Sequence, residues 1–133
     1  MKIMVDANII VSAILFPQSI VSEAVKHMVS NYKLTLSQYT IDEIKEVFDK
    51  KFPHKINEME RFMEKLPYEL FSLKKINNKK YPHIRDIDDI PMLANAIESN
   101  VDLLITGDKD FDEIIIQRPK IITPRKYINE YMK

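Results

Sequence analysis

Hydrophobic residues follow two periods along the chain, and these two periods alternate. Short apolar runs typical of buried strands are Lys2–Val5, Lys33–Ser37, Glu69–Leu73, Asp102–Thr106 and Lys120–Thr123. Apolar residues at helical spacing predict helices over Asn8–Leu15, Ser19–Asn31, Tyr39–Phe52, His54–Leu66, Ile90–Asn100 and Pro124–Met132. Strands that alternate with helices form a parallel sheet with helices on both faces. The pattern therefore predicts an α/β fold, a three-layer α/β/α sandwich around a parallel sheet of about five strands.

The length and composition indicate one ordinary globular domain. The chain has 133 residues, with no repeat and no linker, so we expect a single domain over residues 1–133. There is no cysteine, which excludes disulfides and thiolate metal ligands and favours a reducing, cytoplasmic setting. Asp6 and Asn8 interrupt the apolar start, and no run approaches the roughly 18 residues of a membrane helix. We therefore expect neither a signal peptide nor a membrane span.

Charge is unevenly distributed, although the formal net charge is zero. Residues 50–85 hold ten Lys or Arg against four Glu, a net charge of +6, whereas residues 86–113 hold nine acids against one Lys, a net charge of −8. Charged runs are most often solvated surface. A basic face beside an acidic pocket would also suit a metal-dependent enzyme that acts on a polyanion.

Acidic residues follow the ends of two predicted strands. Asp6 ends the first strand, and Gly107, the only glycine, ends the fourth. Asp108, Asp110 and Asp112 come directly afterwards at alternate positions. Ligand sites in open parallel sheets lie outside the carboxyl ends of the strands. Because crowded carboxylates repel one another, a cation is their natural partner.

Two further segments carry acids toward the same edge. Asp86, Asp88 and Asp89 begin the helix that leads into the fourth strand, and Glu43 lies early in the helix after the second strand. Ligands that are all oxygen atoms favour a hard cation, Mg²⁺ or Mn²⁺, over zinc. The sequence therefore predicts one metal site built from four segments.

Each acid taken alone also has a structural explanation. Asp6 could cap the next helix, and the 86–89 cluster could interact with a helix dipole. Thr40 and Glu43 satisfy the T-x-x-E pattern of a capping box, which favours a structural role for Glu43. Their expected convergence on one sheet edge is what favours a functional site.

Three segments resemble the PIN domain, the metal-dependent ribonuclease fold of VapC-type toxins from bacterial and archaeal toxin–antitoxin pairs. They are VDANIIVSAIL at Val5–Leu15, SQYTIDEIKEV at Ser37–Val47 and RDIDDIPMLANAIESNVDLLITGDKDF at Arg85–Phe111. The ending ITPRKYI at Ile122–Ile128 resembles the tail of one PIN subgroup of toxins. Ile90 and Pro91 stand where that subgroup commonly has polar residues.

The resemblance implies both an activity and a set of site residues. The implied catalytic and metal-binding acids are Asp6, Glu43, Asp89 and Asp108, with Asp110 as a fifth metal ligand and with Asn8 and Thr106 in support. The implied reaction is cleavage of RNA with Mg²⁺ or Mn²⁺, which leaves a 5′-phosphate and a 3′-hydroxyl. A small antitoxin protein and a homodimer are the implied partners.

The basic stretch before the acidic block is the candidate RNA-binding segment. Its cationic residues are Lys74, Lys75, Lys79, Lys80 and Arg85. Such residues can hold an RNA backbone through phosphate contacts.

Two other functions fit parts of the sequence. GDKDFD at Gly107–Asp112 matches the G-D-x-x-x-D motif of haloacid-dehalogenase-type phosphatases. That family also has D-x-D-x-T on its first strand, whereas this chain has Asp6, Asn8 and Ile10 at the corresponding positions. The second alternative is a PIN scaffold that binds RNA or a protein partner without cleaving it.

Overall fold

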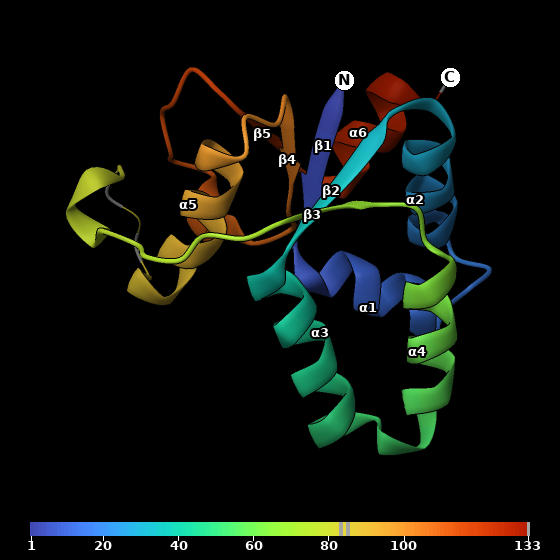
Figure 1. Cartoon of the computed structure of the whole chain (residues 1–133). Helices are drawn as coiled ribbons and strands as arrows, with labels where there is room; N and C mark the ends of the chain where they lie inside the picture. Colours follow the sequence, from blue (N-terminus) through green and yellow to red (C-terminus); the bar gives the residue numbers. More distant parts are fainter. Residues whose placement is uncertain (83, 85, 133) are drawn as a thin grey trace.

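A five-stranded parallel sheet forms the centre of the protein (Figure 1). The computed structural model describes residues 1–82, 84 and 86–132. The strands are β1 (Lys2–Val5), β2 (Lys33–Ser37), β3 (Glu69–Phe71), β4 (Leu103–Ile105) and β5 (Lys120–Ile122). Their order is β3-β2-β1-β4-β5, and every neighbouring pair is parallel. The chain thus adds β2 and β3 on one side of β1, and then β4 and β5 on the other side.

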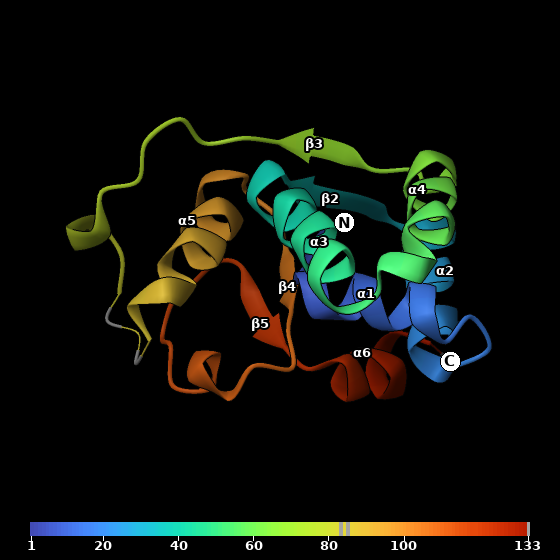
Figure 2. The same cartoon turned by 90° about the horizontal axis from the view of Figure 1, so that it is seen from below.

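Helices cover both faces of this sheet (Figure 2). They are α1 (Ala7–Leu15), α2 (Ile20–Asn31), α3 (Gln38–Lys51), α4 (Ile56–Lys65), α5 (Ile90–Glu98) and α6 (Pro124–Tyr131). Short 3₁₀ turns are η1 (Pro53–Lys55), η2 (Asn78–Lys80), η3 (Ile87–Asp89) and η4 (Lys109–Phe111). The predicted three-layer α/β/α architecture is confirmed.

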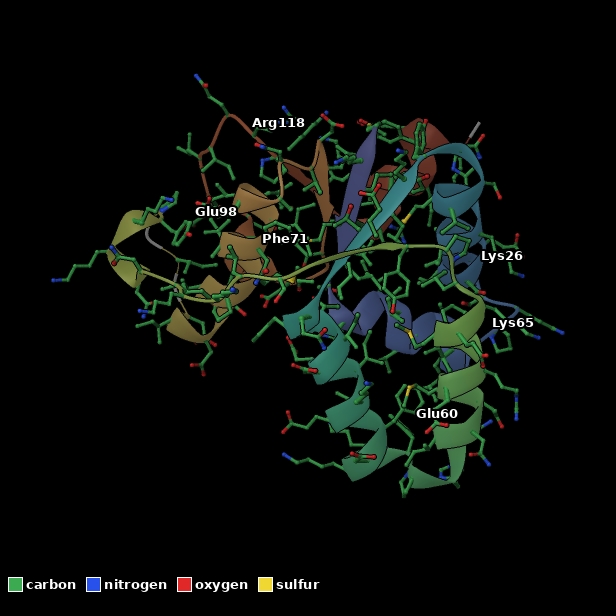
Figure 3. The ribbon with its side chains drawn as sticks, viewed as in Figure 1. Lys26, Glu60, Lys65, Phe71, Glu98 and Arg118 are labelled. Atoms are coloured by element: carbon green, nitrogen blue, oxygen red, sulfur yellow. The ribbon has the colours of Figure 1, made fainter. Side chains whose placement is uncertain are left out.

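Alternate strand residues supply two separate apolar cores. Ile3 and Val5 of β1 pack with residues of α1, α2, α3, α4 and α6, whereas Met4 packs with α5 on the opposite face. This division follows from the period of two in a strand, which sends successive side chains to opposite faces. Because both faces are buried, the central strands are apolar throughout. Charged side chains such as Lys26, Glu60 and Lys65 lie on the outer faces of the helices (Figure 3).

Two strands pass into helices with a single capping residue at the junction. Asp6 follows β1 and caps α1, where its side chain accepts a hydrogen bond from the Ile9 amide. Ser37 ends β2 and caps α3 by accepting a hydrogen bond from the Thr40 amide. These caps satisfy amide groups that the first helical turn leaves unpaired. As a result, the first turns of α1 and α3 lie at the carboxyl edge of the sheet.

Some boundaries differ from the sequence prediction. β3 and β4 are each three residues long, shorter than the five predicted. The helix predicted to reach Asn100 ends at Glu98, and Asn100 has a φ of 58°. Asparagine is among the few residues other than glycine that adopt this left-handed conformation after a helix. Within the described residues, no single helix is long and apolar enough to cross a membrane. Helices α1 and α2 meet that test only as a pair bent by 114°.

Candidate metal centre

An acidic pocket opens at the carboxyl edge of the sheet, where the strand order reverses between β1 and β4. Its volume is about 200 Å³, and the predicted site residues that line it are Asp6, Asn8, Glu43, Asp89, Thr106 and Asp108. A reversal in strand order leaves a crevice because the two adjoining crossovers run to opposite sides. The structure thus brings the four predicted acids to one pocket, while their role as metal ligands stays a prediction.

Asp6 is held on both of its carboxylate oxygens. Oδ1 accepts a hydrogen bond from the Ile9 amide at 3.2 Å, so Asp6 does cap α1. Oδ2 accepts the hydroxyl of Thr106, and the same hydroxyl oxygen accepts the Asp108 amide at 3.1 Å. Burial raises the pKa of Asp6, and the charge of Asp108 adds to the rise. Thr106 therefore couples the ends of β1 and β4 through Asp6 and Asp108.

Glu43 does not belong to a capping box, and that sequence interpretation is wrong. Helix α3 begins at Gln38 with Ser37 as its cap, so Thr40 already lies inside the first turn. Glu43 follows in the second turn, beyond the reach of the unpaired amides that a capping box satisfies. Burial raises the pKa of Glu43, and the negative charge of Asp6 contributes to the rise. Glu43 thus faces the other acids instead of stabilising the helix end.

Tyr39 was not among the predicted site residues. It lines the pocket and hydrogen-bonds the Glu43 carboxylate, and its hydroxyl lies 3.5 Å from the Asp88 carbonyl oxygen. Burial raises the pKa of Tyr39 to about 12, with further contributions from Glu43 and Asp89. The hydroxyl therefore stays protonated, and the Asp88 carbonyl and the Glu43 carboxylate are the two acceptors for its single proton. The sequence signal is the spacing of four residues on one helix, which places the two side chains on one face.

Asp89 has the most unusual environment of the four acids. It precedes α5 at the capping position, yet its side chain makes no capping hydrogen bond. Its Oδ2 is buried and has no hydrogen-bond partner in the described part of the chain. Burial, followed by the charge of Asp108 and a side-chain hydrogen bond with Asp110, raises the pKa of Asp89 to about 7. A helix-capping role therefore does not explain this carboxylate.

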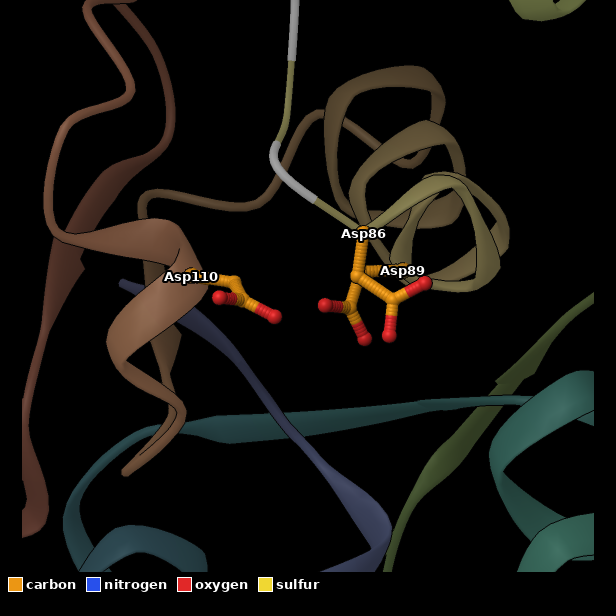
Figure 4. A group of neighbouring side chains, drawn as sticks. All are labelled: Asp86, Asp89 and Asp110. Carbon is orange, nitrogen blue, oxygen red and sulfur yellow. The ribbon is translucent and has the colours of Figure 1, made fainter.

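Asp89 also belongs to a second group of acidic residues, beside the pocket. Carboxylate oxygens of Asp86, Asp89 and Asp110 lie within 4.8 Å of one another (Figure 4). Asp110 is held by its amide, which donates to Asp108 Oδ1 at 2.9 Å. Asp86 was not predicted as a ligand, although it belongs to the acidic cluster at residues 86–89. It also caps η3 by accepting the Asp88 amide at 2.9 Å.

The donor set fits a hard divalent cation. The predicted site residues that line the pocket offer carboxylate, hydroxyl and amide oxygens, which Mg²⁺ and Mn²⁺ prefer. A buried carboxylate oxygen without a donor is costly unless a cation or a proton compensates it. Burial is the first cause of the raised pKa values of Asp6, Glu43 and Asp89, and the charges of neighbouring acids add to the rise. A cation between these acids would compensate the buried Asp89 oxygen and would favour the ionised form of all three carboxyl groups.

The candidate RNA-binding lysines lie on the segment between β3 and α5. Lys74, Lys75, Lys79 and Lys80 are all exposed. Lys80 forms an ion pair with Glu98 at 2.8 Å, so part of its charge is already balanced. Figure 1 shows this segment passing beyond α5 and away from the sheet. Arg85, the fifth candidate, lies outside the described residues.

Comparisons with known proteins agree with this arrangement. A family model for the PIN domain matches residues 2–110. Among solved structures, VapBC2 from Rickettsia felis, bound to a DNA fragment from their promoter, superposes with a TM-score of 0.66. The identity is 21% over 92% of this chain and 97% of that chain, so the likeness concerns the fold. No curated protein sequence gives a significant match. Because the family model spans most of its length, the chain belongs to the PIN-domain family, whose members are nucleases that use divalent metal ions.

Proposed function

We propose that this protein is a divalent-metal-dependent endoribonuclease that hydrolyses RNA phosphodiester bonds. The observation that best supports the proposal is Asp89, whose buried Oδ2 has no donor among the described residues and whose pKa is raised to about 7. A carboxylate with a perturbed pKa in a cleft, surrounded by other acids, is typical of a functional site. Membership of a nuclease family assigns this chemistry to phosphodiester cleavage.

Asp6, Glu43, Asp89 and Asp108 would hold Mg²⁺ or Mn²⁺, and Asp110 would complete the set. When bound, such an ion lowers the pKa of water and offsets charge that builds on the phosphate. Water would form the new bond to phosphorus and release a proton to solvent, while the bond from phosphorus to the 3′ oxygen breaks and that oxygen takes up a proton from solvent. The products would be a 5′-phosphate and a 3′-hydroxyl.

Neutral side chains would keep the acids in place during this reaction. Thr106 donates to Asp6 and accepts from the Asp108 amide, so it fixes two ligands relative to each other. Tyr39 has the corresponding role for Glu43. Asn8 lines the same pocket and offers an amide group for substrate or water. A fixed ligand geometry matters because Mg²⁺ demands a near-ideal octahedral arrangement.

The charge of the site requires a separate means of attracting RNA. Acids around the pocket repel phosphates, whereas the exposed Lys74, Lys75 and Lys79 attract them. We propose that the segment carrying these lysines binds the RNA backbone and that Lys80 contributes less because it pairs with Glu98.

The cellular role that we propose is that of a VapC-like toxin inhibited by a small antitoxin protein. An apolar groove between α2 and α4 offers a surface for such a partner, and its volume is about 390 Å³. Val25, Phe62 and Leu66 line the groove, and Lys26 and Lys65 border it. Figure 3 shows these two lysines on the same side of the molecule. An amphipathic segment with acidic flanks would complement this combination of apolar floor and basic rim.

A cleavage assay with single-stranded RNA tests the nuclease proposal. Cleavage should require Mg²⁺ or Mn²⁺, stop on addition of a chelator, and leave 5′-phosphate ends. Asp89→Asn should lower the rate by at least about 100-fold, because the variant has neither the charge nor the good oxygen donor of the parent ligand. A phosphomonoester serves as the control substrate, since its hydrolysis would favour the phosphatase alternative. RNA binding without cleavage under any metal condition would favour the silent scaffold.

The partner proposal is tested separately by co-purification with the product of the adjacent reading frame. Phe62→Asp in the groove should abolish the complex, whereas Glu60→Lys on the outer face of the same helix should leave it intact. Equal binding by both variants would place the partner elsewhere. Sedimentation of the protein alone would test the expected homodimer.

A further inference from the structure

A second pocket adjoins the acidic pocket and has no assigned role. Its volume is about 320 Å³, and it shares Thr106, Asp108 and Phe111 with the acidic pocket as lining residues. It lies between β5 and the connection that follows η4. A molecule in this pocket would therefore be next to any group bound among the acids.

The walls of this second pocket combine apolar surfaces with a carboxylate. Ile114 and Ile116 from the connection and Ile121 from β5 are half-buried and line it. Asp112, which is exposed, also lines it. Lys120 also lines the pocket, so its charged walls combine two carboxylates with one ammonium group and remain net negative. The pocket therefore suits a group with apolar faces and a hydrogen-bond donor better than it suits a phosphate.

The backbone of β5 adds a donor and an acceptor to these walls. The Lys120 amide donates to the Asp102 carbonyl, and the Ile122 carbonyl accepts from the Thr106 amide. In a parallel ladder, the residue between two such positions directs its N–H and C=O away from the neighbouring strand. Since β5 is at the edge of the sheet, these groups of Ile121 point outward.

We propose that this pocket binds one unpaired nucleobase of the RNA strand, next to the phosphate that is cleaved. A nucleobase has two apolar faces and an edge of hydrogen-bonding groups, which correspond to the isoleucine walls and to the polar groups of Asp112 and Ile121. The Asp112 carboxylate accepts hydrogen bonds, so bases with an exocyclic amino group bind better than uracil. This inference rests on the proposed ribonuclease function and adds a base preference to it.

Nucleosides without phosphate test the pocket independently of cleavage. Titration of the protein with cytidine, adenosine or uridine at millimolar concentration is followed through the isoleucine methyl resonances. The methyl groups of Ile114, Ile116 and Ile121 should shift with cytidine and adenosine more than with uridine, while Ile56 on α4 should not shift. No shift at the three pocket residues, or an equal shift at Ile56, would overturn the inference.

A pair of variants tests the role of Asp112. Asp112→Ala removes the acceptor in the pocket, and Glu113→Ala removes the same charge from the next exposed residue, which does not line it. The parent and Glu113→Ala should bind cytidine about tenfold more tightly than uridine, and Asp112→Ala should bind the two alike. Equal cytidine preference in both variants would remove Asp112 from the recognition of the base.

Nucleoside binding and RNA cleavage are separate measurements with separate outcomes. Methyl shifts in a protein that cleaves no RNA would support the base pocket and contradict the nuclease. Metal-dependent cleavage without methyl shifts would support the nuclease and overturn the base pocket.

Discussion

At the scale of single residues, Asp89 differs from the other acids because nothing in the described chain compensates one of its oxygens. Asp6 receives hydrogen bonds from Ile9 and Thr106, and Glu43 receives one from Tyr39. Asp89 instead lies near the negative charges of Asp86 and Asp108. Its ionisation should therefore destabilise the metal-free protein.

The pH dependence of stability tests this expectation. The pKa of Asp89 is raised from its ordinary 3.8 to about 7, so the folded state retains a proton that the unfolded chain has released. The favourable contribution of the protonated group is complete below pH 3.8 and is lost as the pH rises through about 7. The Tm of metal-free Asp89→Asn, minus that of the parent, should therefore increase from about pH 4 to about pH 8. A difference that does not vary with pH would contradict a destabilising Asp89 carboxylate.

Glu43→Gln separates a ligand role from a structural role. Gln keeps the size of the side chain and can still accept from Tyr39, but it lacks the charge that a cation requires. Cleavage should fall by about 100-fold or more, whereas the metal-free Tm should be unchanged or higher because repulsion with Asp6 is removed. Both quantities are measured on the same preparations.

Asp42→Asn is the matched control for this variant. Asp42 is exposed on the same helix and bonds to Gln38, which Asn can also do. The control should retain full activity. Full activity in Glu43→Gln, or a loss that merely follows a lower Tm, would exclude Glu43 from the site.

At the scale of elements, the residues expected to attract RNA and the residues expected to cleave it lie on different segments. The segment between β3 and α5 is the one expected to attract RNA. It carries exposed lysines, while the acids lie at the ends of β1, β4 and the helices beside them. Lys74→Glu with Lys75→Glu should weaken RNA binding. The slope of log K against log salt concentration should become shallower by roughly 0.7 for each phosphate that is no longer neutralised. Filter binding over a salt series measures this slope.

A double reversal on α3 provides the control for the lysine segment. Lys45→Glu with Lys51→Glu changes the net charge equally at two other exposed positions. Its slope should match that of the parent. Equal weakening in both double variants would indicate a general effect of net charge rather than a binding segment.

At the scale of the whole molecule, a cation would join segments whose acids repel one another in the fold alone. A ligand that binds only the folded state stabilises it, by about 2.7 kcal/mol at one hundred times Kd. Mn²⁺ should therefore raise the Tm of the parent, and the rise should be much smaller in Asp89→Asn. No rise at millimolar Mn²⁺ in a calorimetric scan would contradict a shared site.

The sequence by itself determined the type and order of the elements. Its two hydrophobic periods identify every strand and α-helix to within a few residues, because burial on a sheet or a helix imposes those periods locally. It also located Asp6 and Asp108 after two strands, and the parallel arrangement brings such ends to one edge. The prediction of a capping box at Thr40 was wrong, because Ser37, the last residue of β2, already caps α3.

Only the tertiary structure decided which side chains meet. The approach of Asp86 to Asp110, the bond between Tyr39 and Glu43, and the buried oxygen of Asp89 depend on how α3, α5 and the β4–β5 connection pack around the sheet. The second pocket likewise depends on β5 being an edge strand. Periodicity describes which face of an element is buried, but distances between elements are fixed by strand order and packing, which no local pattern encodes.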